Sequence, residues 1–468
     1  MTPVEEVQNG KELTAQELIW TDCESGFECA TMAVPLDWLN QDGQFLGIHL
    51  TRKTGFDLLP PLLVNPGGPG ASGVSFVQDN YEGIGTSNLR KNFQLIGFDP
   101  RGVGLSEPVT CLDVSLKDQL YYGQSPYEFG SPQDIAWSKD LVEKFAKSCQ
   151  TVGFDLAYFN TQQTARDMDL IRELLGLDEL DYLGYSYGTE LGAVYSALFP
   201  ERVGKFVLDG AVDPTLSAGE TLLNQVVGFD GAFDAYLTDC LSQAGCPFTG
   251  DLDAAKTQVA EFLLGLESST LSTDFDREVG VTAAIYGIIA ALYSQDSWVY
   301  LTQALEEALA GDGTTMMLLA DFYNDRDSSG GYLSNINEAN TAISCADSRV
   351  TDAEAVYLHE QILQASDLFG KYFSYPELSC VGWPEGKGQI ELDFTIDLSN
   401  GPLVIGTTGD PATPYVQAVA LSEMLDGAKL ITFVGEGHTA YGSNACVNEF
   451  VEEYLAGNPL PETEMKCQ

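Results

Sequence analysis

Three residue types that together perform nucleophilic catalysis occur in this chain in the order serine, aspartate, histidine: Ser186, Asp410 and His438. Serine is a weak nucleophile at its ordinary pKa, so it needs an imidazole to take its proton and a carboxylate to orient that imidazole. Ser186 lies in residues 184–188 (GYSYG), which have the G-x-S-x-G spacing of a tight turn between a strand and a helix. The pattern predicts acyl transfer at this hydroxyl.

The choice of general base is narrow because the chain has only 3 histidines. His49 lies within a predicted strand and His359 within a predicted helix, where a structural role is the better interpretation. His438 follows a predicted buried strand in a glycine-rich loop, so we predict it as the base. Asp410 ends the preceding strand, at the edge where open α/β sheets place functional groups. Asp209, at the end of the strand after the serine segment, is the alternative acid.

Residues 65–73 (NPGGPGASG) read as an irregular loop directly after a buried strand. The small residues of this loop allow its backbone to approach a ligand closely. Backbone N–H groups of such a loop, together with the N–H of the residue after the nucleophile, stabilise the negative charge that develops on a substrate carbonyl. We therefore expect Gly68 and Tyr187 to form an oxyanion hole, with Gly67 as the second choice.

Alternating strand and helix patterns surround these residues. An antiparallel hairpin is expected over 23–53, where two alternating apolar segments flank a QDG turn. Later strands are expected at 60–64, 93–99, 182–183, 203–209, 401–410 and within 428–442, and helices within 111–150 and at 160–175, 189–198, 416–425 and 448–455. This alternation predicts a mostly parallel sheet with helices on both faces.

The pattern changes between 214 and 400, where helical segments replace the alternation. We expect helices at 218–241, 251–267, 279–293, 298–311 and 353–365, and a loop at 322–335. Residues 1–213 would then form the first part of a catalytic core, with the oxyanion loop and the serine turn, and 401–468 its second part, with the acid and the histidine. Residues 214–400 would be an inserted helical lid, expected to shape access and specificity.

The chain is strongly acidic, with 22 Lys and Arg against 69 Asp and Glu and a formal net charge of −47. This charge argues against nucleic acid and anionic membrane surfaces as partners. It fits a solvated surface in a salty or extracellular medium, or a field that attracts cationic groups such as peptide amino termini. No apolar stretch of about 18 residues predicts a membrane span. A basic and then apolar signal sequence is also lacking at Met1, so we interpret this as a form without its export signal.

Cysteines fall in near-neighbour couples along the chain, and their number, 10, is even. The disulfides that we expect are Cys23–Cys29, Cys111–Cys149, Cys240–Cys246, Cys345–Cys380 and Cys446–Cys467. Spacing alone does not fix the connectivity of these disulfides. The even number and local pairing of the cysteines nevertheless favour a secreted or cell-surface protein in an oxidising compartment over a cytosolic protein with buried free thiols. No couple has CxxC spacing and histidines are scarce, so we expect no metal and no cofactor.

Six segments together resemble the actinobacterial tripeptidyl aminopeptidase branch of the proline iminopeptidase family, which has the α/β-hydrolase fold. They are NPGGPGASG, FDPRGVGLS, YLGYSYGTELGAVY, FPERVGKFVLDGAVDP, GTTGDPATPY and GEGHTAYG. The resemblance covers nearly the whole chain, is strongest in the sheet and is weak in the lid. Relatives usually carry an aromatic residue where this chain has Glu190, one helical turn beyond the serine, which bears on substrate preference more than on catalysis.

The resemblance implies a secreted serine exopeptidase that releases di- or tripeptides, or single residues, from free N-termini. By it, Ser186 is the nucleophile, Asp410 the orienting acid and His438 the base. It also implies acidic lid residues that bind the substrate ammonium group. The lid offers many, among them Glu220, Asp230, Asp234 and Asp239, and the sequence does not choose between them.

Two other functions remain open from the sequence. A carboxylesterase or lipase would use the same three residues, because ester and amide cleavage share their oxyanion chemistry. A non-catalytic binding protein with this fold would not need Ser186, Asp410 and His438, so their presence counts against it. Oligomeric state and the number of residues removed per cleavage are left undetermined.

Overall fold

A computed structural model describes residues 10–23, 25–461 and 463–468. The expected lack of a signal sequence concerns Met1 and the residues after it, which lie outside these ranges. Within them, no helix combines the length and the apolar character needed to cross a membrane.

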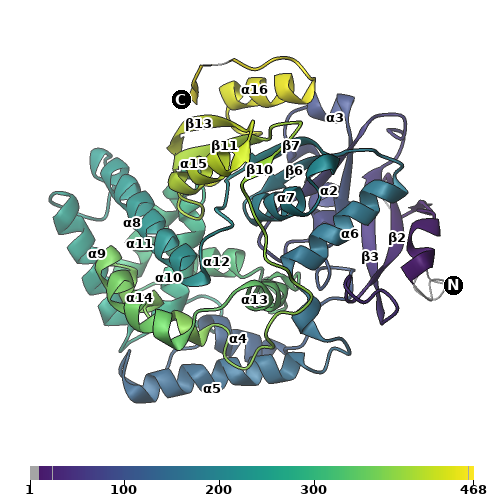
Figure 1. The fold of residues 1–468 in the computed structure, drawn as a ribbon. Coiled ribbons are helices and arrows are strands. Elements are labelled where there is room, and N and C mark those ends of the chain that lie inside the picture. Colours follow the sequence, from purple (N-terminus) through teal and green to yellow (C-terminus); the bar gives the residue numbers. More distant parts are fainter. Residues whose placement is uncertain (1–9, 24, 462) are drawn as a thin grey trace.

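Ten strands of the described residues form one sheet in the order β1-β2-β3-β5-β4-β6-β7-β11-β13-β14 (Figure 1). Their bounds are β1 (Thr21–Asp22), β2 (Phe27–Pro35), β3 (Phe45–Lys53), β4 (Pro61–Asn65), β5 (Gln94–Phe98), β6 (Leu180–Tyr185), β7 (Val203–Asp209), β11 (Leu403–Gly409), β13 (Lys429–Glu436) and β14 (Met465–Cys467). Pairing is antiparallel from β1 to β5 and parallel from β5 to β14. The predicted N-terminal hairpin and the mostly parallel sheet are thus confirmed.

Helices cover both faces of the sheet, as expected. One face packs against α6 (Thr161–Leu174), α7 (Tyr187–Leu198) and α15 (Tyr415–Met424). The other packs against α2 (Gly73–Asp79), α3 (Leu89–Asn92) and α16 (Ala445–Leu455). In β6, Leu180 and Tyr182 are buried on the first side and Leu183 and Tyr185 on the second. Burial on both faces explains why this strand is an apolar run without alternation.

The tail contains a strand that the sequence analysis missed. β14 pairs in parallel with β13 through Met465, Lys466 and Cys467. Three residues with a lysine at the centre carry no strand pattern, and the pairing depends on the neighbouring strand and on the disulfide from Cys467 to Cys446 in α16.

The region between β7 and β11 is mainly helical. Its helices are α8 (Ala218–Ser242), α9 (Leu252–Leu266), α10 (Val281–Leu292), α11 (Trp298–Leu309), α12 (Thr314–Tyr323), α13 (Ile336–Asp347) and α14 (Asp352–Ala365). α12 and α13 were not expected. The region also contains short strands that the sequence analysis did not predict: β8 (Leu271–Ser272), β9 (Glu278–Val279) and β10 (Ile396–Asp397), the last paired with β12 (Leu425–Asp426).

These helices do not form one uniform layer. Helices α8 to α12 and α14 share their own apolar core. They form a helical lobe that lies to one side of the sheet (Figure 1). α13 instead buries Ala339, Ala342 and Ile343 in the core of the sheet domain, and it lies between the helical lobe and the sheet (Figure 1). The lobe is extended from below by α4 (Val114–Tyr122) and α5 (Pro132–Cys149) (Figure 1). α13 therefore connects the two bodies.

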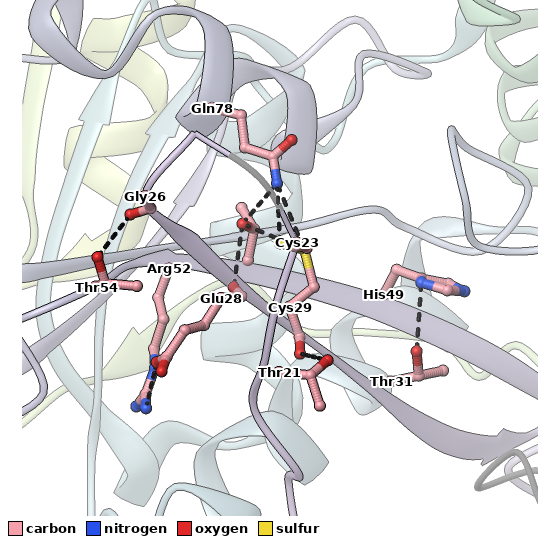
Figure 2. Close-up of a disulfide and its surroundings, with 11 residues drawn as sticks. Thr21, Cys23, Gly26, Glu28, Cys29, Thr31, His49, Arg52, Thr54 and Gln78 are labelled. Carbon is pink, nitrogen blue, oxygen red and sulfur yellow. Dashed lines mark hydrogen bonds and ion pairs between the residues drawn. A yellow bond between two sulfur atoms is a disulfide. The ribbon is translucent and has the colours of Figure 1, made fainter.

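The structure contains five disulfides, between the five expected pairs of cysteines. Figure 2 shows the first, Cys23–Cys29, with the side chain of Gln78 directed toward it from α2. The Nε2 atom of Gln78 also donates to Thr51 Oγ1 at 2.9 Å. This contact joins α2 to the N-terminal hairpin.

A buried ion pair supports the loop after β5. The guanidinium of Arg101 donates to both carboxylate oxygens of Asp167, at 2.9 and 2.6 Å, and both side chains are essentially inaccessible to solvent. Its remaining N–H groups donate to backbone carbonyls of Pro35, Leu36 and Tyr158. Arg101 therefore braces this loop against Asp167 in α6 and against the end of β2.

We expect the Arg101→Leu variant to lose about 3–5 kcal/mol of unfolding free energy, because Asp167 would be left as an uncompensated buried charge. Denaturant unfolding measures this loss. The Lys144→Ala variant is the control, since its pair with Asp140 is exposed and is expected to contribute about 0.5 kcal/mol or less. Equal losses for the two variants would contradict the assignment.

Candidate active site

Ser186 lies at the turn between β6 and α7, in a backbone conformation that side chains rarely adopt. Its φ is +54° and its ψ is −126°. The flanking glycines permit this turn, because a Cβ on Gly184 would lie 2.4 Å from the carbonyl oxygen of Gly188, and one on Gly188 would lie 2.9 Å from that of Asn65. Such strain persists only where the surroundings enforce it, and it is common at functional sites. The turn leaves Ser186 partly exposed.

Asp410 and His438 meet at the carboxyl ends of β11 and β13. Nδ1 of His438 lies 2.9 Å from each carboxylate oxygen of Asp410. Asp410 is 2 % exposed and also accepts the backbone N–H groups of Ala412 and Thr413. Burial lowers the pKa of His438, but the charge and hydrogen bond of Asp410 and the charge of Asp209 together raise it more, so the net pKa lies above its usual value. This arrangement orients the imidazole with Nε2 away from the carboxylate.

The Nε2 atom of His438 is buried and has no hydrogen-bond partner among the described residues. Its contact with the hydroxyl of Ser186 is therefore a proposal, not an observed hydrogen bond. The strand order supports it, because β6, β7, β11 and β13 are successive neighbours whose carboxyl ends lie together. Catalytic hydrogen bonds are often long without substrate and shorten in the complex.

Asp209 joins the serine turn to the histidine loop. Its backbone oxygen accepts the N–H of Ser186 at 2.8 Å, and its carboxylate accepts the N–H groups of Ala440 and Tyr441. Burial raises the pKa of Asp209 to about 6. Because the carboxylate bonds the backbone after His438 and not the imidazole, the geometry favours Asp410 over Asp209 as the orienting acid.

The loop after β4 lies against the serine turn. A Cβ on Gly67 would lie 2.5 Å from the carbonyl oxygen of Tyr185, so the two backbones are in close contact there. The N–H of Gly67 already donates to Asn65 Oδ1 at 2.9 Å. This bond favours Gly68, with Tyr187 at the start of α7, as the oxyanion donors, and it leaves Gly67 as the weaker choice.

α13 supports the oxyanion loop, a role that the sequence analysis missed. Asn340 Nδ2 donates to the carbonyl of Pro69 at 3.1 Å. A Cβ on Gly70 would lie 2.5 Å from the carbonyl of Ile336, so loop and helix are in backbone contact. The sequence carries no signal of this packing, because α13 lies about 270 residues along the chain from the loop.

The histidine loop contacts the helical lobe in a similar way. The backbone N–H of His438 donates to the carbonyl of Tyr293 at 2.9 Å. The ring of Tyr293 meets the imidazole edge-on, with centroids 5.4 Å apart. Tyr293 directly follows α10, so this helix touches the proposed base.

Two carboxyl groups near the Ser186 turn form no ion pair with any described residue. Glu190 stands one turn beyond Ser186 in α7, and burial together with the charge of Asp347 raises its pKa to about 8. Burial raises the pKa of Asp347 to about 7, although Thr161 donates to it from both its N–H and its hydroxyl. The Thr161 hydroxyl also bonds the phenol of Tyr187 at 2.5 Å. The first turn of α7 is thus connected to Asp347 at the end of α13.

The other residues singled out from the sequence lie in separate places with partners of their own. His49 pairs with Thr31 across the N-terminal hairpin, as Figure 2 shows. His359 contacts the carbonyl of Ser374. The acidic lid residues likewise have partners: Glu220 with Ser217, Asp230 and Asp234 with Lys256, and Asp239 with Gln243. No group of three or more His, Cys, Asp or Glu suited to a metal ion occurs in the described parts of the chain.

The chain is similar to several known proteins. The family model described as "alpha/beta hydrolase fold" matches residues 60–445. The chain is 35% identical to "Serine protease Hip1" of Mycobacterium tuberculosis, covering 97% of this chain and 91% of that protein. It is also 35% identical to "Carboxylesterase B" of the same organism, covering 98% and 91%. It is 29% identical to "Tripeptidyl aminopeptidase" of Streptomyces lividans, covering 96% and 86%.

We expect the Asp410→Asn variant to lower kcat about 10³- to 10⁴-fold, because an amide would favour the wrong tautomer of His438 and would not stabilise its protonated form. Steady-state hydrolysis of an activated ester measures the loss. The Glu423→Gln variant, on the exposed side of α15, controls for removal of a nearby carboxylate. Retention of more than about a tenth of kcat in Asp410→Asn would rule out this residue as the orienting acid.

The Glu190→Gln variant should change how stability depends on pH. Folded Glu190 keeps its proton up to about pH 8, whereas the unfolded chain releases it near the ordinary value of 4.5, so this residue weakens the fold as pH rises between those values. At pH 9 the variant should therefore be more stable than the wild type. Its advantage in unfolding free energy should be at least about 1 kcal/mol larger at pH 9 than at pH 5. Thermal unfolding at both pH values tests this, with the exposed Glu391→Gln as control. Parallel shifts at the two pH values would disprove it.

Proposed function

The chain belongs to the alpha/beta hydrolase family, and from that membership we propose that this serine hydrolase is a secreted exopeptidase that releases short peptides from free N-termini. Its relatives fit the tripeptidyl aminopeptidase branch that the motifs indicate. The observation that carries the proposal is the Asp410–His438 pair at the sheet edge that also bears the strained Ser186 turn.

The proposed mechanism proceeds through an acyl-enzyme. Ser186 Oγ attacks the peptide carbonyl while Nε2 of His438 takes its proton, and the N–H groups of Gly68 and Tyr187 stabilise the oxyanion. The leaving amine then receives that proton from His438. Water, deprotonated by the same imidazole, attacks the ester and releases the N-terminal fragment. Asp410 holds the tautomer throughout and stays ionised.

Two further features support the proposal. Five disulfides are typical of proteins in oxidising compartments, which fits secretion. Residues 214–400 serve as a lid in this proposal, because Tyr293 contacts the histidine loop and Asn340 contacts the oxyanion loop. Helices that touch both loops control how a substrate reaches them.

The second candidate function is a carboxylesterase. The relative named "Carboxylesterase B" is as similar to this chain as the serine protease is, at 35% identity. The same residues would catalyse ester cleavage, because both reactions pass through a tetrahedral oxyanion. Only the substrate distinguishes the two functions.

A panel of chromogenic substrates separates them. We expect unblocked tripeptide anilides to be cleaved with a kcat/KM about 100-fold or more above their N-acetylated counterparts, because an exopeptidase must recognise the free ammonium. Simple p-nitrophenyl esters are assayed beside them. The Ser186→Ala variant, which also should not react with a fluorophosphonate probe, is the control for contaminating activity. Cleavage of esters alone would refute the peptidase proposal.

A further inference from the structure

A large cavity lies between the helical lobe and α5, outside the immediate surroundings of the proposed triad. Its volume is about 1090 Å³, and α5, α8, α10 and the short helix η6 (Gly370–Phe373) contribute to its wall. Cavities of about 300–1,000 Å³ hold drug-sized ligands, so this space admits several residues of a peptide.

Three residues of the cavity wall make contacts that lead to the proposed catalytic loops. Gln225 in its wall donates to the carbonyl of Ala412, two residues after Asp410, and Asn340 in its wall donates to Pro69 of the oxyanion loop. The third wall residue, Tyr286, stacks on Tyr323 with ring centroids 5.2 Å apart.

Tyr323 completes this third connection. Its ring lies 6.2 Å from that of Tyr293, which in turn contacts His438. The wall of the cavity is therefore joined by side-chain contacts to the segments that carry His438, Asp410 and the loop of residues 65–73.

The lining is aromatic, and the ammonium group of Lys371, which lies over the rings of Phe129 and Tyr372, is already paired with Glu267. Among the described residues that form the wall there is neither lysine nor arginine. The aromatic residues are Tyr127, Phe129, Trp137, Tyr286, Tyr372, Phe373 and Tyr375. The carboxyl groups are those of Glu128, Asp134 and Glu267, and of these Glu267 is paired with Lys371 at 2.5 Å. Asp134 is only 6 % exposed.

These properties define what the cavity can bind. Apolar side chains gain about 25 cal/mol for each Å² that they bury against such a wall. An acidic side chain would lose its hydration, meet Asp134 and Glu128, and find no cation in the wall to compensate. A free ammonium group, in contrast, would be attracted by the same carboxylates.

We propose that this cavity holds the part of the peptide on the N-terminal side of the cleaved bond, and that it selects aromatic or aliphatic side chains there and rejects acidic ones. The inference rests on the proposed peptidase function and adds its side-chain specificity. The cavity is the acyl-side binding site, so the side chains that it sorts belong to the fragment transferred to Ser186.

The first test uses unblocked tripeptide anilides that carry either phenylalanine or aspartate at the second and third positions before the cleaved bond. The wild type is expected to prefer phenylalanine about 100-fold or more in kcat/KM. Filling the cavity with Leu222→Trp is expected to raise KM for the phenylalanine peptide about tenfold. Val227→Trp, on the same helix but 51% exposed and outside the wall, is the matched control.

A second variant places a positive charge at the rim without disturbing the core. Leu264 belongs to the wall but is 51% exposed, so Leu264→Arg should fold normally. It is expected to improve kcat/KM for the aspartate peptide about tenfold, whereas Val227→Arg, which changes the net charge equally, should not.

The outcomes separate this inference from the proposed function. Cleavage of unblocked peptides without discrimination between phenylalanine and aspartate, or with no response to Leu222→Trp and Leu264→Arg, would overturn the inference and leave the peptidase proposal standing. Cleavage of esters but of no unblocked peptide would overturn both.

Discussion

The strained turn at Ser186 is the constraint on which the rest of the site depends. A positive φ at a serine is costly, and the fold maintains it by close backbone packing at Gly184 and Gly188 and by the bond from Ser186 N–H to Asp209. Asp209 belongs to the neighbouring strand and also binds the backbone of the histidine loop. The Ser186 turn and the backbone after His438 are thus held by one buried residue, Asp209.

The catalytic loops are supported from the helical lobe as well as from the sheet. Asn340 holds the oxyanion loop, Gln225 the loop after Asp410, and Tyr293 the loop of His438. Each hydrogen bond between uncharged groups contributes only about 1 kcal/mol to the free energy of unfolding, so these contacts orient the loops more than they stabilise the fold. Displacement of the lobe would therefore change the geometry of three loops at once.

Sequence motifs and the order of strand and helix patterns along the chain were enough to predict most of the sheet domain. Strong apolar patterns with clear glycine and capping signals occur in β6, β7, α6 and the N-terminal hairpin. These elements lie where the sequence predicts them. β14, α12 and α13 were missed because their residues carry weak patterns. β14 has three residues, and α13 exposes polar side chains while packing small ones such as Ala339 and Ala342. Their structure depends on partners far away in the chain.

The sequence by itself determined the chemical identity of the candidate site: one serine in a G-x-S-x-G turn, one histidine in a suitable loop, two candidate acids, and five pairs of cysteines. Tertiary structure decided what each of these touches. In the fold, the imidazole of His438 contacts Asp410, and the backbone after His438 donates to Asp209. The N–H of Gly67 donates to Asn65 in its own loop, and helices distant in sequence enclose an aromatic cavity. The reason is physical: residue type and spacing fix local backbone geometry, whereas hydrogen-bond partners and cavity walls arise only when distant segments pack together.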